Sequence, residues 1–490
     1  MVLTTRITRY FIELFCAAGL RRWRVPGRPP LLDKSAKSPP LGRRLLLGYS
    51  LGSLGTGVYS TVPGVLLLYY MTDFLGVASA LGAIVLFFPK IWGILTDPLI
   101  GRLSDRTRGR FGRRRPWLLA GAIGVGLSFI LLFRAPVSAD PMVGFWYVLV
   151  LYGVSAAAYS LFAVPYIAMP AEMSEDPAER SRVMAWRMTF VMAGVMVGAG
   201  FAPILVSRFG GGHAGFGAMS LIVGAFCAAA MFATFLATRN APSRVAAIHD
   251  ASFGAELLSV WGDRLFRALM LAYLLQAVAA AIGSALLPYT VTRILNRDPA
   301  MIGTMGVATL CAGMLAMPLW HHLSVQFGKR AVFAGAAIWK AFVVMLWIFA
   351  GPGLPIWAAH LLAVGAGIGF AGLQLIPFSM VTDVIHHDAR RNGRAREGVY
   401  TGVWTSCEKA GLAIGPLFAA AVLALGGYVA SKNGAMTPQA PTALLAIRLG
   451  ISVLPAALLL LSLAAMRRFD LVEGDVGDLG SQEGAEPQRG

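Results

Sequence analysis

Long apolar segments alternate with short polar ones along most of the chain. A helix needs about 20 apolar residues to cross roughly 30 Å of hydrocarbon. A window of that length predicts spans near 45–71, 79–101, 116–135, 143–170, 184–206, 217–238, 266–290, 301–320, 331–350, 357–385, 399–427 and 441–466. A longer polar segment separates the sixth span from the seventh. The pattern therefore predicts an all-α membrane protein with twelve transmembrane helices in two six-helix bundles.

The predicted domains follow from these spans. They are a basic amino tail (1–44), an N-terminal bundle (45–238), a central linker (239–265), a C-terminal bundle (266–466) and a carboxyl tail (467–490). Lysine and arginine concentrate in the loops that follow even-numbered spans, and such basic loops usually stay in the cytoplasm. We therefore expect a multi-pass protein of the plasma (inner) membrane with both termini and the linker in the cytoplasm.

Composition excludes a soluble protein. Hydrophobic residues make up 57% of the chain and charged residues only 13%, whereas a soluble domain has roughly 25% charged residues. The net charge of +18 would suit nucleic acid, but the basic residues occur in short runs between apolar spans, as in cytoplasmic loops. The expected partner is the lipid bilayer, and nucleic acid is not expected.

Two short sequences recur at equivalent places in the two sets of spans. Residues 111–114 (Phe-Gly-Arg-Arg) follow the second span, and residues 327–330 (Phe-Gly-Lys-Arg) follow the eighth. Residues 164–166 (Val-Pro-Tyr) in the fourth span are matched by residues 376–378 (Ile-Pro-Phe) in the tenth. Repeated bundles with a solute site between them are common in transporters. We therefore expect the two bundles to be pseudo-symmetric.

Residues 45–466 resemble the glycoside-pentoside-hexuronide:cation symporter family of the major facilitator superfamily. Four motifs carry the likeness: Tyr69-Tyr70-Met71-Thr72-Asp73; Ile91-Trp92 leading to Asp97-Pro98 and the basic loop; Val164-Pro165-Tyr166 followed by Arg187; and Asp383 with Glu397 and then Lys409-Ala410-Gly411. The resemblance implies a secondary transporter that carries a sugar, glycoside, uronate or related small organic solute together with a cation by alternating access. No cofactor is expected besides the coupling cation.

Asp97 is the first candidate for cation coupling, because an ionisable side chain inside a membrane span is costly and usually functional. Lys90, Gly93 and Asp97 share one helix face through their spacing. In the resembling symporters a second aspartate normally replaces Gly93, so that two carboxylates can hold sodium. A proton needs only one carboxylate, so Gly93 favours proton over sodium coupling, although sodium stays possible. Alternatively, Asp97 caps the helix and pairs with the basic loop.

Lys409 is the second candidate, because by resemblance it lies near the cation site. It could compete with the cation for Asp97 and so link ion binding to rocking of the bundles; the alternative is a static pair with Asp97 or Glu408. Arg187 is a gate residue by family position, or a side chain that snorkels to the surface. The other predicted gating residues are Asp105, Arg106, Arg113, Asp383 and Glu397.

Departures from the family pattern bear on the solute. The resembling sugar carriers grip hydroxyl groups with two aspartates, and the corresponding positions here hold Gly57 and Ala163. The remaining candidates for the substrate cavity are Lys90, Tyr59, Tyr159, Tyr166, Gln276, Gln374 and Trp404. Any of the tyrosines could serve packing alone. The cationic side chains of Lys90, Arg187 and Lys409 weakly favour an acidic solute.

Other functions stay open. Vertebrate relatives with the Asp97-Pro98 signature carry lysophospholipids, and Phe87, Phe88 and Phe162 would suit an acyl chain. A non-transporting sensor is a further alternative. A membrane enzyme or an ATP-driven pump is not expected, because the sequence has no His-Glu-x-x-His or Gly-x-x-x-x-Gly-Lys-Ser/Thr motif, and no metal site is expected. The sequence does not identify the solute or the oligomeric state.

Overall fold

The described part of the chain is helical and follows the predicted order of spans. The computed structural model describes residues 41–107, 112–136, 138, 140–174, 177–241, 262–392, 397–431 and 437–467. The predicted amino tail up to Pro40, most of the central linker and nearly all of the carboxyl tail lie outside these residues. The unit that begins at Leu41 is described by itself.

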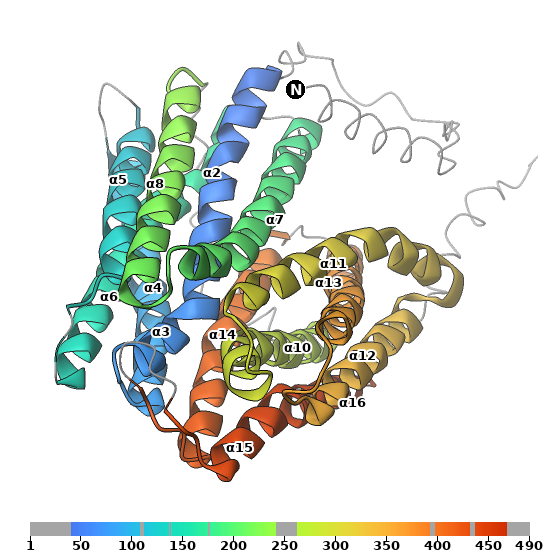
Figure 1. Ribbon diagram of the computed structural model, residues 1–490. Helices are drawn as coiled ribbons and strands as arrows, with labels where there is room; N and C mark the ends of the chain where they lie inside the picture. The colour runs from blue at the N-terminus through green and yellow to red at the C-terminus, as the bar shows by residue number, and fades with distance from the viewer. Residues whose placement is uncertain are drawn as a thin grey trace, which may run out of the picture. The chain divides into compact units, whose positions relative to one another are not determined.

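The first six spans are shown in blue to green in Figure 1. The first span is divided by a π-helical turn, η1, and the set comprises α2 (Arg43–Val62), η1 (Pro63–Leu67), α3 (Leu68–Asp73), α4 (Ser79–Arg106), α5 (Arg115–Leu132), α6 (Pro141–Met173), α7 (Pro177–Arg208) and α8 (Gly212–Thr238). The Asp140 side chain caps α6 by accepting a hydrogen bond from the backbone N–H of Met142.

The last six spans run from yellow-green to red in Figure 1. They comprise α10 (Arg264–Tyr289) with the π-helical turn η2 (Thr290–Ile294), α11 (Ala300–Phe327), α12 (Lys329–Met345) with the 3-10 turn η3 (Leu346–Phe349), α13 (Ile356–Asn392), α14 (Glu397–Leu425), and α15 (Pro441–Ile451) with α16 (Val453–Met466). Eleven described helices are long and apolar enough to cross a membrane, and Ser79–Lys90 of α4 is a shorter apolar helix. All twelve predicted spans correspond to helices.

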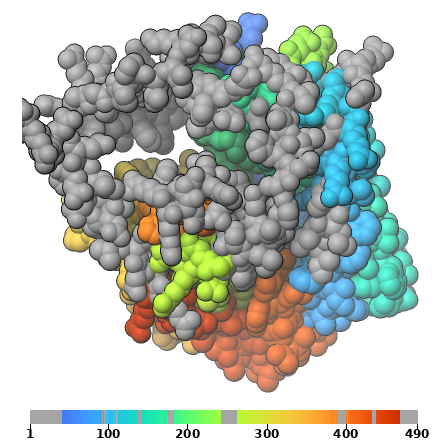
Figure 2. All heavy atoms as spheres, turned by 180° about the vertical axis from the view of Figure 1, so that it is seen from behind, coloured from blue at the N-terminus to red at the C-terminus, as the bar shows by residue number. Residues whose placement is uncertain are grey.

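The helices pack mainly within each set of six. In the N-terminal bundle (α2–α8), α2 packs on α7 and α8; in the C-terminal bundle (α10–α16), α10 packs on α14 and α16. The bundles meet mainly where α7 packs on α11 and α4 packs on α14, and α10 also contacts η1 and α3. In the space-filling view the orange surface of α14 borders the blue surface of α4 (Figure 2). Residues on α4 and α14 can therefore meet across the bundle interface.

The crossing of α7 and α11 depends on glycine. A methyl group built on Gly303 would overlap the carbonyl oxygen of Gly200, and one built on Gly200 would overlap the side chain of Val307. Small residues let the backbones of membrane helices approach closely. The two bundles therefore touch here through their backbones, with no room for a side chain between them.

The two bundles share local features that match the sequence repeats. Gly112 and Gly328 both have φ in the left-handed region, at +84° and +80°, which glycine adopts without a steric penalty. The first helix of each bundle also contains a π-helical turn, η1 beginning at Pro63 and η2 two residues after Pro288. Such turns often mark functional sites, and both lie toward the same end of the molecule.

Replacing Gly303 by alanine should destabilise the protein, because the new methyl group would push α7 away from α11. Overpacking of this kind costs about 1–3 kcal/mol. Gly283 in α10 offers a matched control, since a methyl group there meets nothing within 4 Å. Thermal unfolding of the purified protein in detergent should show a lower midpoint for Gly303→Ala than for Gly283→Ala. Equal midpoints would mean that the crossing tolerates a side chain.

Candidate functional site

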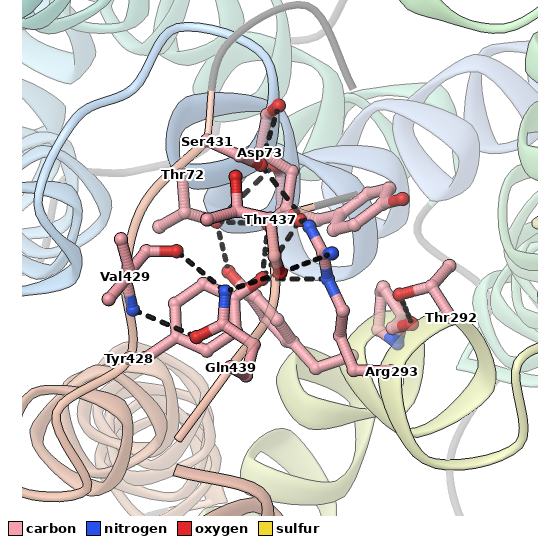
Figure 3. A network of polar contacts seen from close by, with 12 residues as sticks. Thr72, Asp73, Thr292, Arg293, Tyr428, Val429, Ser431, Thr437 and Gln439 are labelled. Carbon is pink, nitrogen blue, oxygen red and sulfur yellow. Dashed lines mark hydrogen bonds and ion pairs between the residues drawn. The ribbon is translucent and has the colours of Figure 1, made fainter. Parts of the chain in front are cut away.

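One end of the molecule is closed by a buried ion pair between the bundles (Figure 3). Arg293 of η2 donates a hydrogen bond to the Asp73 carboxylate at the end of α3, and the side chains are only 6% and 1% exposed. The Tyr428 hydroxyl lies 2.8 and 2.9 Å from the two carboxylate oxygens and donates to them. Burial, together with the Asp73 charge, raises the pKa of Tyr428 well above its ordinary value, so the phenol keeps its proton.

Backbone and hydroxyl groups extend this contact. The Ser431 N–H donates to the Thr72 carbonyl oxygen at 2.8 Å, and the Ser431 hydroxyl donates to the Asp73 carbonyl oxygen at 3.2 Å. The hydroxyls of Thr72 and Tyr289 lie 2.7 Å apart. This end of the molecule, which we call the latch end, is thus held shut between the bundles by one group of side chains, the latch: Asp73, Arg293, Tyr428 and Ser431.

At the opposite end the described ion pairs each stay within one bundle. Arg113 Nη2 lies 2.5 Å from Glu172 Oε1, and Arg114 pairs with the same carboxylate. Lys329 Nζ lies 2.5 Å from Asp383 Oδ2. Two predicted gating residues, Arg113 and Asp383, therefore pair inside their own bundles in this conformation, at corresponding places in the two halves.

The other predicted gating residues are placed differently. Arg106 is the last residue of α4 and is exposed, and the side chains of Asp105 and Glu397 lie outside the described residues. Arg187 lies within α7, and its Cζ is 5.7 Å from the ring centre of Tyr166, within cation–π distance. Its Nε is buried without a hydrogen-bond partner in the described part of the chain. Arg187 therefore contacts an aromatic ring inside the N-terminal bundle.

Between the two ends, Asp97 and Lys409 face each other across the bundle interface. Lys409 Nζ on α14 lies 3.6 Å from Asp97 Oδ2 on α4. The lysine side chain is 63% exposed and the aspartate 29% exposed, so water reaches the pair. The second carboxylate oxygen, Asp97 Oδ1, is buried without a hydrogen-bond partner among the described residues. This loosely paired carboxylate is suited to bind and release a cation.

Two neighbours of Asp97 on α4 shape its surroundings. Lys90 lies two turns before Asp97 on α4 and is half-buried. Gly93 lies one turn from Asp97, and a methyl group built on it meets nothing within 4 Å. The structure therefore has room for a side chain at position 93 although the sequence provides none.

Aromatic and polar side chains of the C-terminal bundle meet beside this ion pair. Tyr273 and Trp404 stack with their ring centres 4.1 Å apart, and Phe378 packs against Trp404 at 5.5 Å. The Tyr273 hydroxyl donates to Glu408 Oε1 at 2.9 Å, and Gln374 Oε1 lies 3.4 Å from the same hydroxyl. We call the following residues of α10, α13 and α14 the C-terminal cluster: Tyr273, Gln276, Gln374, Phe378, Trp404 and Glu408.

The predicted tyrosines of the N-terminal bundle fall into two environments. Tyr59 and Tyr159 stack with ring centres 4.6 Å apart, and the Tyr159 hydroxyl lies 3.5 Å from the exposed Ser60 hydroxyl. Tyr166 is fully buried, and its hydroxyl donates to the carbonyl oxygen of Tyr49 at 2.8 Å. In this conformation Tyr166 belongs to the packing between α2 and α6, whereas Tyr159 is the tyrosine with an accessible hydroxyl.

Helix packing explains why the chain has glycine at position 57. A methyl group built on Gly57 would lie 2.5 Å from the carbonyl oxygen of Val191, and one on Gly194 would overlap that of Leu54. The backbones of α2 and α7 are therefore too close for an aspartate at Gly57. Acceptors for a hydroxylated solute must come from other positions.

Sequence reasoning predicted Gln276, Gln374 and Trp404 but missed other members of the C-terminal cluster and the latch. Glu408 gave a signal, because it is a carboxylate inside an apolar span, but hydropathy does not show that it turns toward Tyr273. The latch was missed because its two charges are 220 residues apart along the chain: Asp73 was noted only as the end of a family motif, and nothing in the sequence pairs it with Arg293. Only the packing of the two bundles brings them together.

Comparison with known proteins identifies the type of fold and carrier. A family model described as MFS/sugar transport protein matches residues 48–473. Symporter sll1374 of Synechocystis sp., named as uncharacterized, is 26% identical over 88% of this chain and 94% of its own. The glucuronide carrier protein homolog of Escherichia coli is 24% identical (88% and 93%), and the sphingosine-1-phosphate transporter MFSD2B of Xenopus tropicalis is 23% identical (87% and 87%).

Solved structures agree on the fold. A bacterial homolog of the human lysosomal transporter Spinster, in an inward-facing and unoccupied conformation, superposes with a TM-score of 0.65 at 14% identity, covering 87% of this chain and 97% of that one. The predicted two-bundle transporter fold is therefore confirmed.

Neutralising Asp73 by Asp73→Asn should open the latch end, because it leaves the buried Arg293 charge without this counter-charge. Removing one partner of a buried pair costs about 3–5 kcal/mol; 3 kcal/mol corresponds to roughly a hundredfold change in an equilibrium. We expect maleimide to label a cysteine placed at Val291, which is fully buried, at least about tenfold faster in this variant when the native cysteines are removed.

The control for this prediction is Asp298→Asn. Asp298 also links the bundles at the latch end, by accepting a hydrogen bond from Ser207 at 2.5 Å, but on the exposed surface, where such contacts contribute little. Labelling should stay near the wild-type rate in Asp298→Asn. An unchanged rate in Asp73→Asn as well would show that the buried pair does not hold this end closed.

Proposed function

The chain belongs to the MFS/sugar transport protein family, and on that premise we propose that it carries a small hydroxylated solute together with a proton by alternating access. It is a multi-pass membrane symporter and not an enzyme. A sugar, a glycoside or a uronate is the solute class that we propose. The observation that carries the proposal is the Asp97–Lys409 pair, which joins the two bundles at a place that water reaches.

Proton coupling is favoured over sodium coupling by the surroundings of Asp97. A dehydrated sodium ion needs several oxygen ligands, whereas a proton needs one carboxylate. Gly93, one turn from Asp97, has no side chain and so provides no side-chain oxygen ligand, although a side chain would fit there. The buried and unpartnered Oδ1 of Asp97 offers a place for one proton.

The proposed coupling step is an exchange at Asp97. While Asp97 is ionised, Lys409 pairs with it across the bundle interface. Protonation of the carboxylate removes the attraction, so the Lys409 ammonium turns to the solute or to water, and α4 is no longer tied to α14 through this pair. Binding of a proton is thereby linked to the relative motion of the bundles. Arg187, which lies over the Tyr166 ring in the N-terminal bundle, would change its surroundings during that motion.

We further propose that the protein lies in the plasma (inner) membrane. In the orientation that we propose, the latch end faces outward and both termini lie in the cytoplasm. The support is the concentration of basic residues at the opposite end, including Arg113, Arg114 and Lys329, as the positive-inside rule expects of cytoplasmic loops. With that orientation, this conformation is closed to the outside and gives access from the cytoplasm.

An amphipathic solute such as a lysophospholipid is the second candidate. Phe88 and Trp92 on α4 are both about two-fifths exposed, at 42% and 41%, and their rings lie 6.1 Å apart. An exposed aromatic pair of this kind would suit an acyl chain. The relative named sphingosine-1-phosphate transporter points to the same class.

Proteoliposomes that contain a pH-sensitive dye test the main proposal. Addition of the transported solute should acidify the lumen in the wild type without sodium, and Asp97→Asn should reduce this proton uptake to background, because an amide does not bind a proton at neutral pH. Asp140→Asn is the matched control: it makes the same change at a helix cap, where asparagine serves as well as aspartate, and should transport normally.

The outcomes separate the alternatives. Proton uptake driven by a glycoside or uronate and lost in Asp97→Asn would support the proposal. Uptake that requires sodium would refute proton coupling. Uptake driven by lysophospholipids alone would replace the solute class and leave the role of Asp97 standing.

Gly93→Asp should add sodium dependence, because it places a second carboxylate one helical turn from Asp97 in open space. We expect sodium at millimolar concentration to stimulate solute uptake several-fold in this variant and to have little effect on the wild type. Gly93→Asn controls for the size of the new side chain. A wild-type response to sodium equal to that of Gly93→Asp would contradict the assignment.

A further inference from the structure

The C-terminal cluster contains polar atoms whose hydrogen-bonding capacity is not used. Trp404 and Gln276 are 3% and 4% exposed, yet the Trp404 Nε1 donor and the Gln276 Oε1 acceptor have no hydrogen-bond partner among the described residues. Leaving a buried polar group unpaired costs about 1–3 kcal/mol, and native proteins rarely accept that cost without a functional reason. One donor, Trp404 Nε1, and one acceptor, Gln276 Oε1, are therefore available to a ligand within the same group of helices.

The hydrogen bonds that are made leave further acceptors available. Gln276 uses its Nε2 to donate to the Leu373 carbonyl oxygen at 2.9 Å, so only its oxygen remains. Tyr273 has one hydroxyl proton, which serves Glu408 at 2.9 Å better than Gln374 at 3.4 Å. A carboxylate accepts about four hydrogen bonds, so Glu408 can accept more than the one from Tyr273.

An apolar surface lies beside these polar atoms. Phe378 is 43% exposed and stands edge-on to Trp404 and to Tyr273, with ring centres 5.5 and 6.0 Å away. A sugar ring has C–H groups on its faces and hydroxyl groups around its edge. Hydroxyls both donate and accept, so such a ring matches several acceptors, one indole donor and an aromatic surface at once, whereas an acyl chain would leave the polar atoms unpaired.

The charges of this region favour a neutral ring over an anionic one. Glu408 has a neutral phenol as its hydrogen-bond partner. A carboxylate on a solute bound at Glu408 would lie close to this like charge and be repelled by it.

We propose that the C-terminal cluster is the ring-binding subsite of the carrier, in which Glu408 accepts hydroxyl hydrogen bonds, Trp404 Nε1 donates one, and a neutral pyranoside is preferred to a uronide. This proposal rests on the function proposed above and names its solute more closely. Glu408 and Lys409 are adjacent on α14, so the subsite lies next to the Asp97–Lys409 ion pair. This proximity links solute binding to cation binding.

Calorimetric titration of the purified full-length protein tests the subsite. The probes are the p-nitrophenyl β-glycosides of glucose, galactose and xylose as neutral rings, and p-nitrophenyl β-D-glucuronide as the anionic one. The wild type should bind at least one neutral probe about tenfold or more tightly than the glucuronide. Glu408→Gln should weaken binding of that probe roughly 10- to 150-fold, the range for hydrogen bonds to a charged group, and should narrow the preference over the glucuronide.

Two further variants separate recognition from folding. Trp404→Phe keeps an aromatic ring and removes the Nε1 donor, so it should weaken the neutral probe while the thermal midpoint stays near that of the wild type. Ser406→Ala on the same helix, whose hydroxyl donates to the Gly402 carbonyl oxygen of its own helix, should bind like the wild type. A purely structural role of Glu408 would weaken both kinds of probe equally and leave their ratio unchanged.

The two proposals fail separately. The subsite is overturned if no neutral probe binds, if the glucuronide binds more tightly in the wild type, or if Glu408→Gln leaves both affinities unchanged. Lysophospholipid-driven proton uptake that is lost in Asp97→Asn would then keep the coupling proposal standing. Conversely, tight binding of a neutral probe without solute-driven proton uptake would refute the proposal of proton coupling and leave the proposed subsite standing.

Discussion

Asp73 and Arg293 are opposite charges that have been taken out of water at the place where the two bundles meet. Desolvation of each charge is costly, and their contacts with each other and with Thr72, Tyr428 and Ser431 help to compensate for it. The bundles therefore cannot part at the latch end unless this group of contacts is broken. Arg293 lies in η2, and Asp73 ends α3, the helix that follows η1, so the first helix of each bundle provides one half of the closure.

The second ion pair between the bundles, Asp97 with Lys409, is of a different kind. Its lysine is largely exposed and its aspartate partly so, at a looser 3.6 Å; exposed pairs contribute at most about 1 kcal/mol, against about 3–5 kcal/mol for breaking a buried pair. On the proposed mechanism, exchange of a proton at Asp97 would break this tie between α4 and α14 but would not by itself open the latch. Opening the latch would need the interaction free energy of solute and cation together, which is the condition for obligatory coupling in a symporter.

The sequence predicted the parts of this protein that depend on local composition. Apolar spans of sufficient length must become helices in a bilayer, so the predicted order of spans matches the described helices. Asp97 and Lys409 could also be predicted to meet, because each is costly alone within a span. The latch could not be predicted, since nothing in the sequence pairs Asp73 with Arg293 before the helices pack. The contact of Glu408 with Tyr273 likewise follows from the packing of α10 on α14, which hydropathy does not show.

Packing in the N-terminal bundle has consequences for where a solute can be held. The close approach of α2 and α7 at Gly57 leaves no room for an acidic side chain there, whereas α14 of the C-terminal bundle carries Glu408 beside Lys409. In the arrangement that we propose, the N-terminal bundle contributes Asp97 for the cation, and the C-terminal bundle contributes the acceptors for the ring. On that proposal the two ligands are held by different bundles, so a rocking motion that parts α4 from α14 would also part the two sites. The solute and the cation would then act on each other across that interface, and this would be the step at which transport of one depends on transport of the other.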